Sequence, residues 1–249
     1  MIDLEVAIPS YYRPYKLKTS TLVLLEGIPI KHIKIYVEND EQYNIYRACL
    51  GENYTIIITN TKGIGEKRNF IKKHTKAKYL LQIDDDIVAI KNKLGEALSG
   101  KEVYDLILMG FKECEEHGFR LWGICGFSNY FFFNNTITTN LKFICGNFHG
   151  TIMDDNPIFT PINTLEDYYN TCSHFLEDGG VLRLNGYGTK TNFAVEKGGL
   201  QSFLTKQQRK DEESENAKII LDTFGNKMVK IIKKERGDDI RLNYRFKLL

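Results

Sequence analysis

The segment from Tyr79 to Asp86 constrains the fold of this chain more than any other. Tyr79–Ile83 is mostly apolar, as expected of a short buried strand, and it ends in three consecutive carboxylates, Asp84, Asp85 and Asp86. Adjacent carboxylates repel one another and lose solvation energy when they pack together. A divalent cation at the strand end would offset both costs, and oxygen ligands favour Mg²⁺ or Mn²⁺. Taken alone, the run is equally compatible with a solvated acidic turn.

Strand-like and helix-like segments alternate through the first 90 residues. The expected elements are strands at Leu4–Ile8, Ile33–Val37 and Tyr54–Thr59, a helix from Pro14 that includes Leu17, Thr21, Leu24 and Leu25, a helix over about residues 41–50, and a helix of about three turns opened by Gly63 and Gly65. Such alternation predicts an α/β fold with a mostly parallel sheet, whose ligands bind at the carboxyl ends of the strands. The polar segments at those ends should therefore converge on one edge: Ser10–Arg13, Glu38–Asp40, Gly63–Asn69 and Asp84–Asp86.

The pattern is looser after Ile87. We expect a helix with Val103 to Cys114 on its apolar face, strands at Leu121–Phe127, Leu141–Cys145 and Val181–Asn185, a helix from Leu165 to Leu176, glycine-containing loops at Gly186, Gly188, Gly198 and Gly199, and helix or surface chain over Lys206–Glu215. The aromatic run Tyr130–Phe133 either packs on both sides or forms an exposed platform for a sugar or a base.

Composition predicts a soluble globular protein: 42% of the residues are hydrophobic and 27% are charged. The five scattered cysteines form no CxxC pair and predict reduced thiols, and no segment suits a signal peptide or a membrane span, so we expect a cytoplasmic protein without a membrane partner. The net charge of +2 predicts no polyanion partner by itself. However, Lys227–Lys247 holds eight Lys/Arg and three acids, which indicates either a phosphate-binding tail or a solvated helix face.

Two nucleotide-binding motifs are missing from the sequence. It has no GxxxxGK[ST] phosphate loop and no GxGxxG after the first strand, which argues against a kinase and against a nicotinamide enzyme. A carboxylate cluster at a strand end, with the cations Lys67 and Arg68 at a helix start, instead suits a nucleotide diphosphate whose phosphates bridge a metal ion.

The first 90 residues resemble the GT-A glycosyltransferases. Val6–Pro14 looks like their opening strand and turn, Gly63-x-Gly65-x-x-Arg68-Asn69 like their ribose-contacting helix, and Tyr79–Asp86 like their DxD strand. Later, Leu165-Glu166-Asp167 resembles the xED motif that supplies the base in inverting members. The resemblance implies one GT-A domain over residues 1–249, with a nucleotide-sugar-binding half (1–90), an acceptor and catalytic half (91–200) and a basic C-terminal extension (201–249).

A narrower resemblance, to the TET-associated glycosyltransferases, extends to about residue 200. It rests on the motifs above together with Val181-x-Arg183-x-Asn185 and Gly198-Gly199. This family includes viral and T-even phage enzymes that add sugars to hydroxymethylcytosine in DNA. The resemblance implies transfer of glucose from UDP-glucose, with Mn²⁺ or Mg²⁺, to hydroxymethylcytosine or glucosyl-hydroxymethylcytosine. The alternatives are a glycan or protein acceptor, or a catalytically silent module that binds nucleotide sugars or nucleic acid. Stereochemistry stays open, because the xED motif indicates inversion whereas the phage α-glucosyltransferases retain configuration.

The resemblance also implies roles for individual residues. Asp86 would bind the metal ion and Asp84 the ribose or the metal, while Asp85 would orient its neighbours. The residues expected to contact the donor are Pro9, Ser10, Tyr11, Arg13, Gly65, Arg68 and Asn69, with Glu38 or Asp40 accepting from the uracil N3–H. Packing residues or a plain turn would explain several of these equally well.

Four later residues have competing interpretations. Asp167 is either the catalytic base, with Glu166 as the alternate, or the acid of a Thr164-x-x-Asp167 capping box. His149 is either a third metal ligand or structural. Arg183 and Lys190 would contact the sugar diphosphate or an acceptor phosphate, or lie on the surface.

Overall fold

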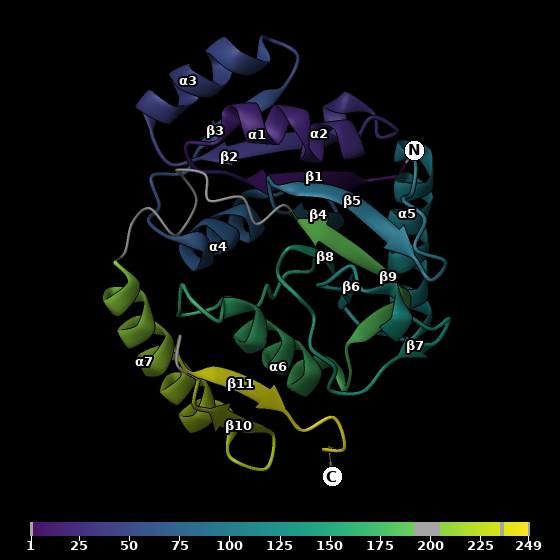
Figure 1. Ribbon diagram of the computed structural model, residues 1–249, viewed down its shortest axis with the longest axis vertical. Helices are drawn as coiled ribbons and strands as arrows, with labels where there is room; N and C mark the ends of the chain where they lie inside the picture. The colour runs from purple at the N-terminus through teal and green to yellow at the C-terminus, as the bar shows by residue number, and fades with distance from the viewer. Residues whose placement is uncertain (1, 192–204, 235–236, 249) are drawn as a thin grey trace.

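The computed structural model of the chain describes residues 2–191, 205–234 and 237–248. Within them, nine strands form one sheet in the order β3-β2-β1-β4-β8-β6-β9-β5, with β7 paired to β9 (Figure 1). These strands are β1 (Leu4–Pro9), β2 (Ile33–Val37), β3 (Thr55–Ile58), β4 (Tyr79–Ile83), β5 (Ile87–Asn92), β6 (Leu121–Cys125), β7 (Ile137–Thr138), β8 (Phe148–Ile152) and β9 (Leu182–Thr191). A separate antiparallel hairpin consists of β10 (Val229–Ile232) and β11 (Asp239–Leu242).

The first four strands of the sheet are parallel. β1 pairs with β2 and β4, and β2 pairs with β3, whereas β8 is antiparallel to both β4 and β6. The chain moves outward from β1 to β3 and then returns to the other side of β1 as β4. Ligands of open α/β sheets bind at such a reversal, beyond the carboxyl ends of the strands. The predicted α/β fold is confirmed, and the reversal lies between Ser10 and the three aspartates.

Helices cover both faces of the sheet (Figure 1). They are α1 (Pro14–Thr19), α2 (Thr21–Leu24), α3 (Asp40–Leu50), α4 (Ile64–His74), α5 (Gly100–Glu116), α6 (Glu166–Asp178) and α7 (Lys206–Phe224), with 3₁₀ turns at Ile30–His32 and Tyr130–Phe132. Side chains alternate along β1: Val6 and Ile8 join the core under α1, α2, α3 and α5, whereas Ala7 packs with Ile71 of α4. A third core joins α6, α7 and the hairpin, so α6 lies between the sheet and the hairpin.

Two predicted elements differ in the structure: the helix after Pro14 and the strand Leu141–Cys145. The single helix expected after Pro14 is two short helices, α1 and α2, which are separated at Ser20. The Ser20 hydroxyl donates to the carbonyls of Lys16 and Asp85. The expected strand Leu141–Cys145 is not a strand. Its apolar residues pack against α6, and the Ile144 N–H donates to the Thr171 hydroxyl rather than to a neighbouring strand. The strand begins later, at Phe148.

The predicted loop at Gly186 and Gly188 is also wrong, because both glycines lie inside β9. A Cβ on Gly188 would lie 2.1 Å from the carbonyl oxygen of Phe127, so glycine is required there by close packing rather than by a turn. Gly198 and Gly199 lie outside the described residues. β5 and the β10–β11 hairpin were not predicted. Of the two alternatives for Lys206–Glu215, helix or surface chain, the structure shows the helix, within α7.

The aromatic run forms a 3₁₀ turn with an exposed surface. Phe131 and Phe132 are 82% and 70% exposed, whereas Phe133 is buried against the sheet. The five cysteines are free thiols, as predicted, and three of them are buried. Among the described residues, no helix combines the length and the apolar character that crossing a membrane requires.

Candidate active site

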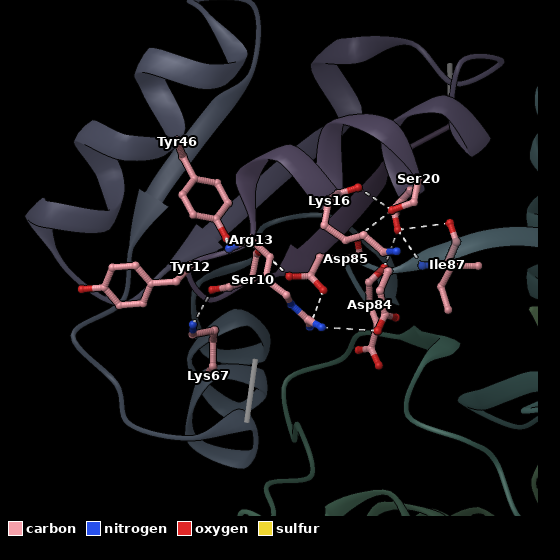
Figure 2. A network of polar contacts seen from close by, with 12 residues as sticks. Ser10, Tyr12, Arg13, Lys16, Ser20, Tyr46, Lys67, Asp84, Asp85 and Ile87 are labelled. Atoms are coloured by element: carbon pink, nitrogen blue, oxygen red, sulfur yellow. Dashed lines mark hydrogen bonds and ion pairs between the residues drawn. The ribbon is translucent and has the colours of Figure 1, made fainter. Parts of the chain in front are cut away.

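The carboxyl ends of β1 and β4 are joined by a network of buried polar contacts (Figure 2). The Ser10 hydroxyl donates to Oδ2 of Asp85 and accepts from the hydroxyl of Tyr46 on α3. Arg13 Nη2 lies 2.5 Å from Asp85 Oδ1, and Arg13 Nη1 lies 3.4 Å from Asp86 Oδ2. Asp85 is only 1% exposed and both its oxygens have partners, so it organises the strand end. Burial raises the pKa of Asp85 to about 6, and Arg13 opposes the shift.

Helix α2 fixes the backbone turn that carries the aspartates. The Thr21 hydroxyl donates to the carbonyl of Asp84 at 2.8 Å and accepts from the Ile87 N–H at 3.0 Å. The Ser20 hydroxyl donates to the carbonyl of Asp85 at 3.1 Å (Figure 2). The helix break at Ser20 therefore places two hydroxyls on the acidic turn and sets the direction in which its side chains project.

Arg68 of α4 joins three separate segments of the site. Its Nη2 lies 2.9 Å from Asp84 Oδ1, its Nη1 donates to the carbonyl of Gly146 at 2.5 Å, and its Nε lies 3.3 Å from Glu166 Oε1. The side chain is 7% exposed. A buried guanidinium with two carboxylate partners holds the end of β4 beside the start of α6, which unites the predicted DxD and xED residues.

The outer aspartates are the ones that reach solvent. The side chains of Asp84 and Asp86 are 34% and 24% exposed. Loss of solvent raises the pKa of Asp84; Asp86 and Asp85 add to the rise, and Arg68 opposes it. This repulsion, together with an all-oxygen donor set, fits Mg²⁺ or Mn²⁺. No cluster of three or more His, Cys, Asp or Glu residues in the described chain is arranged to hold a metal ion, so substrate phosphates and water would supply the other ligands.

His149, the predicted third ligand, contacts a cation. Its Nδ1 donates to the carbonyl of Gly146 at 3.1 Å and lies 3.4 Å from Arg68 Nη1. Burial and the charge of Arg68 lower the pKa of this imidazole well below its ordinary value. The structure does not bring His149 into contact with Asp84 or Asp86, and its role as a ligand stays a prediction.

A second polar cluster follows β2 and borders the start of α4. Lys67 Nζ donates to the carbonyl of Ser10 at 2.9 Å and lies 5.9 Å from the centroid of the Tyr11 ring. Burial lowers the pKa of Lys67 to about 8, against the opposing charge of Glu38. Oε2 of Glu38 is buried and has no hydrogen-bond donor among the described residues. Asp40 is exposed on the first turn of α3, so Glu38 is the better placed of the two predicted acceptors.

The capping box, one of the two interpretations of Asp167, is absent at the start of α6. Leu165 occupies the N-cap in the left-handed conformation (φ 61°), and no side chain caps the helix. The Thr164 hydroxyl accepts instead from Asn216 Nδ2 of α7, at 2.7 Å. Asp167 Oδ2 accepts from the Gly146 N–H at 3.2 Å and its Oδ1 from the Tyr168 N–H at 2.9 Å. Burial raises the pKa of both Glu166 and Asp167, which makes each a stronger base.

Gly65 and Asn69, predicted to contact the donor, have evident packing roles. A Cβ on Gly65 would lie 2.0 Å from the carbonyl oxygen of Ile162. The side-chain amide of Asn69 donates to the Thr160 carbonyl at 2.7 Å and accepts from the Thr160 N–H at 3.0 Å. Both residues therefore hold the segment before α6 against α4. Pro9 is buried at the end of β1.

Lys190 and Arg183 lie at different places along β9. Lys190 is exposed and adjoins Thr191, which pairs with Ile87 directly after the aspartates. Arg183 lies near the beginning of the strand, where its Nε donates to Asn185 Oδ1 at 2.8 Å. The described contacts do not join Arg183 to the aspartates.

Lys72 is a buried residue of the site that sequence reasoning missed. Its Nζ donates to the carbonyl of Ile158 at 2.8 Å and to Asn170 Oδ1 at 2.7 Å. With Arg68, His149, Glu166 and Asp167 it lines a small cavity between α4 and α6. Its spacing of four residues from Arg68 places both cations on one face of α4, and this spacing is the signal that would have found it.

Comparison with solved structures supports the fold. S. aureus TarS residues 1–349 in complex with UDP-GlcNAc aligns with a TM-score of 0.54 and 16% identity, over 89% of this chain and 67% of that one. The Pyrobaculum calidifontis mannosyltransferase PcManGT with GDP-Man and Mn²⁺ aligns with a TM-score of 0.56 and 10% identity, over 88% and 64%. Glucosyl-3-phosphoglycerate synthase from Mycobacterium tuberculosis, in complex with Mn²⁺, UDP and glucosyl-3-phosphoglycerate, aligns with a TM-score of 0.57 and 9% identity, over 97% and 87%.

The chain therefore has the GT-A fold that was predicted. At these identities the likeness establishes the fold alone. The chain spans about two thirds of the 1–349 form of TarS and 40% of a longer TarS structure. No protein-family model and no curated protein matches it.

The burial of Lys72 predicts a characteristic pH dependence of stability. Burial lowers its pKa from 10.5 to about 7, and the neutral amine still donates to both of its acceptors. Between these pH values the unfolded chain binds more protons than the folded protein, so stability rises with pH. Relative to Lys72→Met, the free energy of unfolding of the wild type should rise by on the order of 1 kcal/mol per pH unit between pH 7 and 10, as measured by urea unfolding. If stability changes with pH in parallel in the wild type and Lys72→Met, the lowered pKa of Lys72 is wrong. Lys73→Met, at the exposed neighbouring position, is the control.

Proposed function

We propose that this protein is a metal-dependent glycosyltransferase that uses a nucleotide sugar. The observation that carries the proposal is the contact of one buried guanidinium, that of Arg68, with both Asp84 and Glu166. This contact joins the carboxylate-rich end of β4 to the acidic start of α6. A donor diphosphate at the first site and an acceptor hydroxyl at the second would thus lie next to each other, as group transfer requires.

The donor we propose is a UDP-sugar, with glucose as the favoured sugar. Its uracil N3–H would donate to the buried Oε2 of Glu38, which has no other donor among the described residues. Asp84 and Asp86 would hold Mn²⁺ or Mg²⁺, which supplies positive charge to the diphosphate when bound. Lys190 is exposed on β9, next to Thr191, which pairs with Ile87, and it adds a positive charge near the strand end.

Asp167 is the proposed base. It would accept the proton of the acceptor hydroxyl as the acceptor oxygen bonds to the anomeric carbon. The bond from that carbon to the donor diphosphate breaks, and the nucleoside diphosphate leaves with the electron pair. The N–H groups of Gly146 and Tyr168 fix the carboxylate of Asp167, so the base is oriented before substrate binds.

For the acceptor we propose DNA that contains hydroxymethylcytosine or its glucoside. The support is the resemblance of the sequence motifs to the TET-associated glycosyltransferases, together with the basic C-terminal segment. The competing candidates are a glycan or protein acceptor and a binding module without turnover. The intact aspartates of the strand end, joined to Glu166 through Arg68, favour an active enzyme over a silent module.

Incubation with Mn²⁺ and a panel of UDP-sugars tests the function directly. Each donor is combined with hydroxymethylated DNA, plain DNA, a glycan or no acceptor, and transfer is followed by mass spectrometry. We expect sugar on the hydroxymethylated DNA alone. Transfer to the glycan but not to DNA would show that the acceptor is wrong, and neither transfer nor donor hydrolysis with any donor would show that the chain is not a transferase.

Asp86→Asn should weaken the Mn²⁺-dependent binding of UDP about tenfold or more, because it removes one of the two exposed carboxylates proposed as ligands. Isothermal titration of the protein with UDP, once in Mn²⁺ and once in EDTA, gives the part of the UDP affinity that depends on the metal. Asp105→Asn, an exposed change on α5, is the matched control. Equal Mn²⁺-dependent affinity in the wild type and Asp86→Asn would refute the ligand assignment.

Asp167→Asn should lower turnover about 100- to 10,000-fold while the thermal midpoint changes little. The neutral side chain cannot take up the acceptor proton, although it still accepts one backbone hydrogen bond. Glu166→Gln is the comparison, because it removes the other acid. Full activity in Asp167→Asn with an inactive Glu166→Gln would transfer the role to Glu166, and a decrease in activity that only follows a decrease in stability would make Asp167 structural.

A further inference from the structure

The C-terminal hairpin has one apolar face and one cationic face. Val229, Ile240 and Leu242 are buried in the core that includes Ala217 and Ile220 of α7. Because side chains alternate along a strand, Lys230 and Arg241 project from the opposite face, and both are exposed. The strand register places Lys230 directly across from Arg241. Two like charges in this arrangement destabilise a hairpin, so folding alone does not account for the pair.

The two cations belong to a larger groove. Five exposed cations line it: Lys227, Lys230, Arg241, Arg245 and Lys247. None of the five forms an ion pair with a carboxylate in the part of the chain that the structure describes. Near the turn of the same hairpin the situation differs, because Lys233 pairs with Asp238 and Lys234 with Asp239. Since the whole chain carries a net charge of only +2, the unpaired charge of the groove is a local concentration.

An aromatic ring and two further cations continue this surface. Tyr244 lines the groove with 55% of its surface exposed, and Lys142 Nζ lies 5.5 Å from the centroid of its ring. Burial and then the charge of Arg183 lower the pKa of Lys142. Arg183 itself has no carboxylate partner among the described residues. The positive surface thus extends from the hairpin toward the beginning of β9.

The groove is fixed relative to the candidate active site through α6. The Tyr168 hydroxyl, near the start of α6, donates to Asp239 Oδ1 of β11 at 3.1 Å. The ring centroids of Phe175 and Phe246 lie 6.2 Å apart near the other end of that helix. A helix of 13 residues is about 20 Å long, which corresponds to about six base pairs at 3.4 Å each. The contact of Phe175 with Phe246 is therefore at most about six base pairs of duplex length along α6 from Glu166 and Asp167.

We propose that this groove binds the phosphate backbone of the DNA acceptor and positions it for modification at the start of α6. The inference rests on the proposed function and names a surface for its acceptor. Five exposed cations without carboxylate partners in one groove can each contact a phosphate of a polyanion, and Tyr244 offers a ring for a sugar or an unstacked base. The contacts are with the backbone, so the groove would bind DNA with or without the modified base.

The test compares two triple variants of equal charge change. Lys230→Ala/Arg241→Ala/Lys247→Ala alters the groove, and Lys93→Ala/Lys101→Ala/Lys112→Ala alters exposed lysines in and before α5. Binding of a short hydroxymethylated duplex is measured by fluorescence anisotropy over a range of salt concentrations. The groove variant should bind about tenfold or more weakly, with a salt slope smaller by about 0.9 for each phosphate that it no longer neutralises. Its thermal midpoint should not fall, because the change removes a like-charge pair.

Several outcomes would overturn the inference. The groove variant could bind DNA with the affinity and salt slope of the wild type, or the control variant could bind DNA as weakly as the groove variant. The wild type could also bind vesicles of phosphatidylserine and phosphatidylcholine but not DNA. UDP-sugar hydrolysis without acceptor separates the two proposals. If the groove variant modifies DNA with wild-type kcat/KM, the groove is wrong and the proposed function stands. If the wild type hydrolyses UDP-sugar but transfers to no DNA, the DNA acceptor is wrong and the groove proposal fails with it.

Discussion

The position of the guanidinium of Arg68 determines how the two halves of the candidate site meet. One side chain from α4 contacts Asp84 after β4, Glu166 at the start of α6 and the carbonyl of Gly146 before β8. A buried charge left without its partner costs several kcal/mol, and Arg68 is the charged partner of both carboxylates. The relative placement of β4 and α6 is thus set by electrostatics in addition to apolar packing. A lysine has one compact ammonium group in place of the planar guanidinium, so it could not contact all three of these partners at once.

Backbone strain is concentrated around the same site. The described residues include three non-glycine residues with positive φ, namely Tyr12 at 51°, Asn60 at 53° and Leu165 at 61°. Tyr12 follows β1, Asn60 follows β3, and Leu165 directly precedes Glu166. Asparagine adopts this conformation readily, whereas at Tyr12 and Leu165 it costs about 1–3 kcal/mol and persists where surrounding contacts enforce it. At Leu165 those contacts are the ion pair of Glu166 with Arg68 and the hydrogen bonds of Asp167, so the strained residue directs both acids into the site.

Local sequence patterns predicted the donor half well because its determinants are local. Apolar runs ending in polar residues identified β1 to β4, and the rule for parallel strands then brought Ser10, Arg68 and Asp84 to one edge. The same reasoning failed where a distant residue decides the outcome. Gly188 lies inside a strand because the carbonyl of Phe127 approaches it. Thr164 fits a capping box, yet Asn216 of α7 takes its hydroxyl and the helix begins after a left-handed Leu165. The hairpin groove depends on a register that its sequence does not reveal.

The charges around the strand end explain why metal and donor should bind together. Five carboxylates, Asp84, Asp85, Asp86, Glu166 and Asp167, lie there against four cations, Arg13, Lys67, Arg68 and Lys72. A further diphosphate would meet net negative charge in a partly buried site, where repulsion is poorly screened. A divalent cation between the outer aspartates and the diphosphate would offset the negative charge of both groups. Burial is the largest cause of the raised pKa of Asp84, and the neighbouring charges of Asp86 and Asp85 add to it.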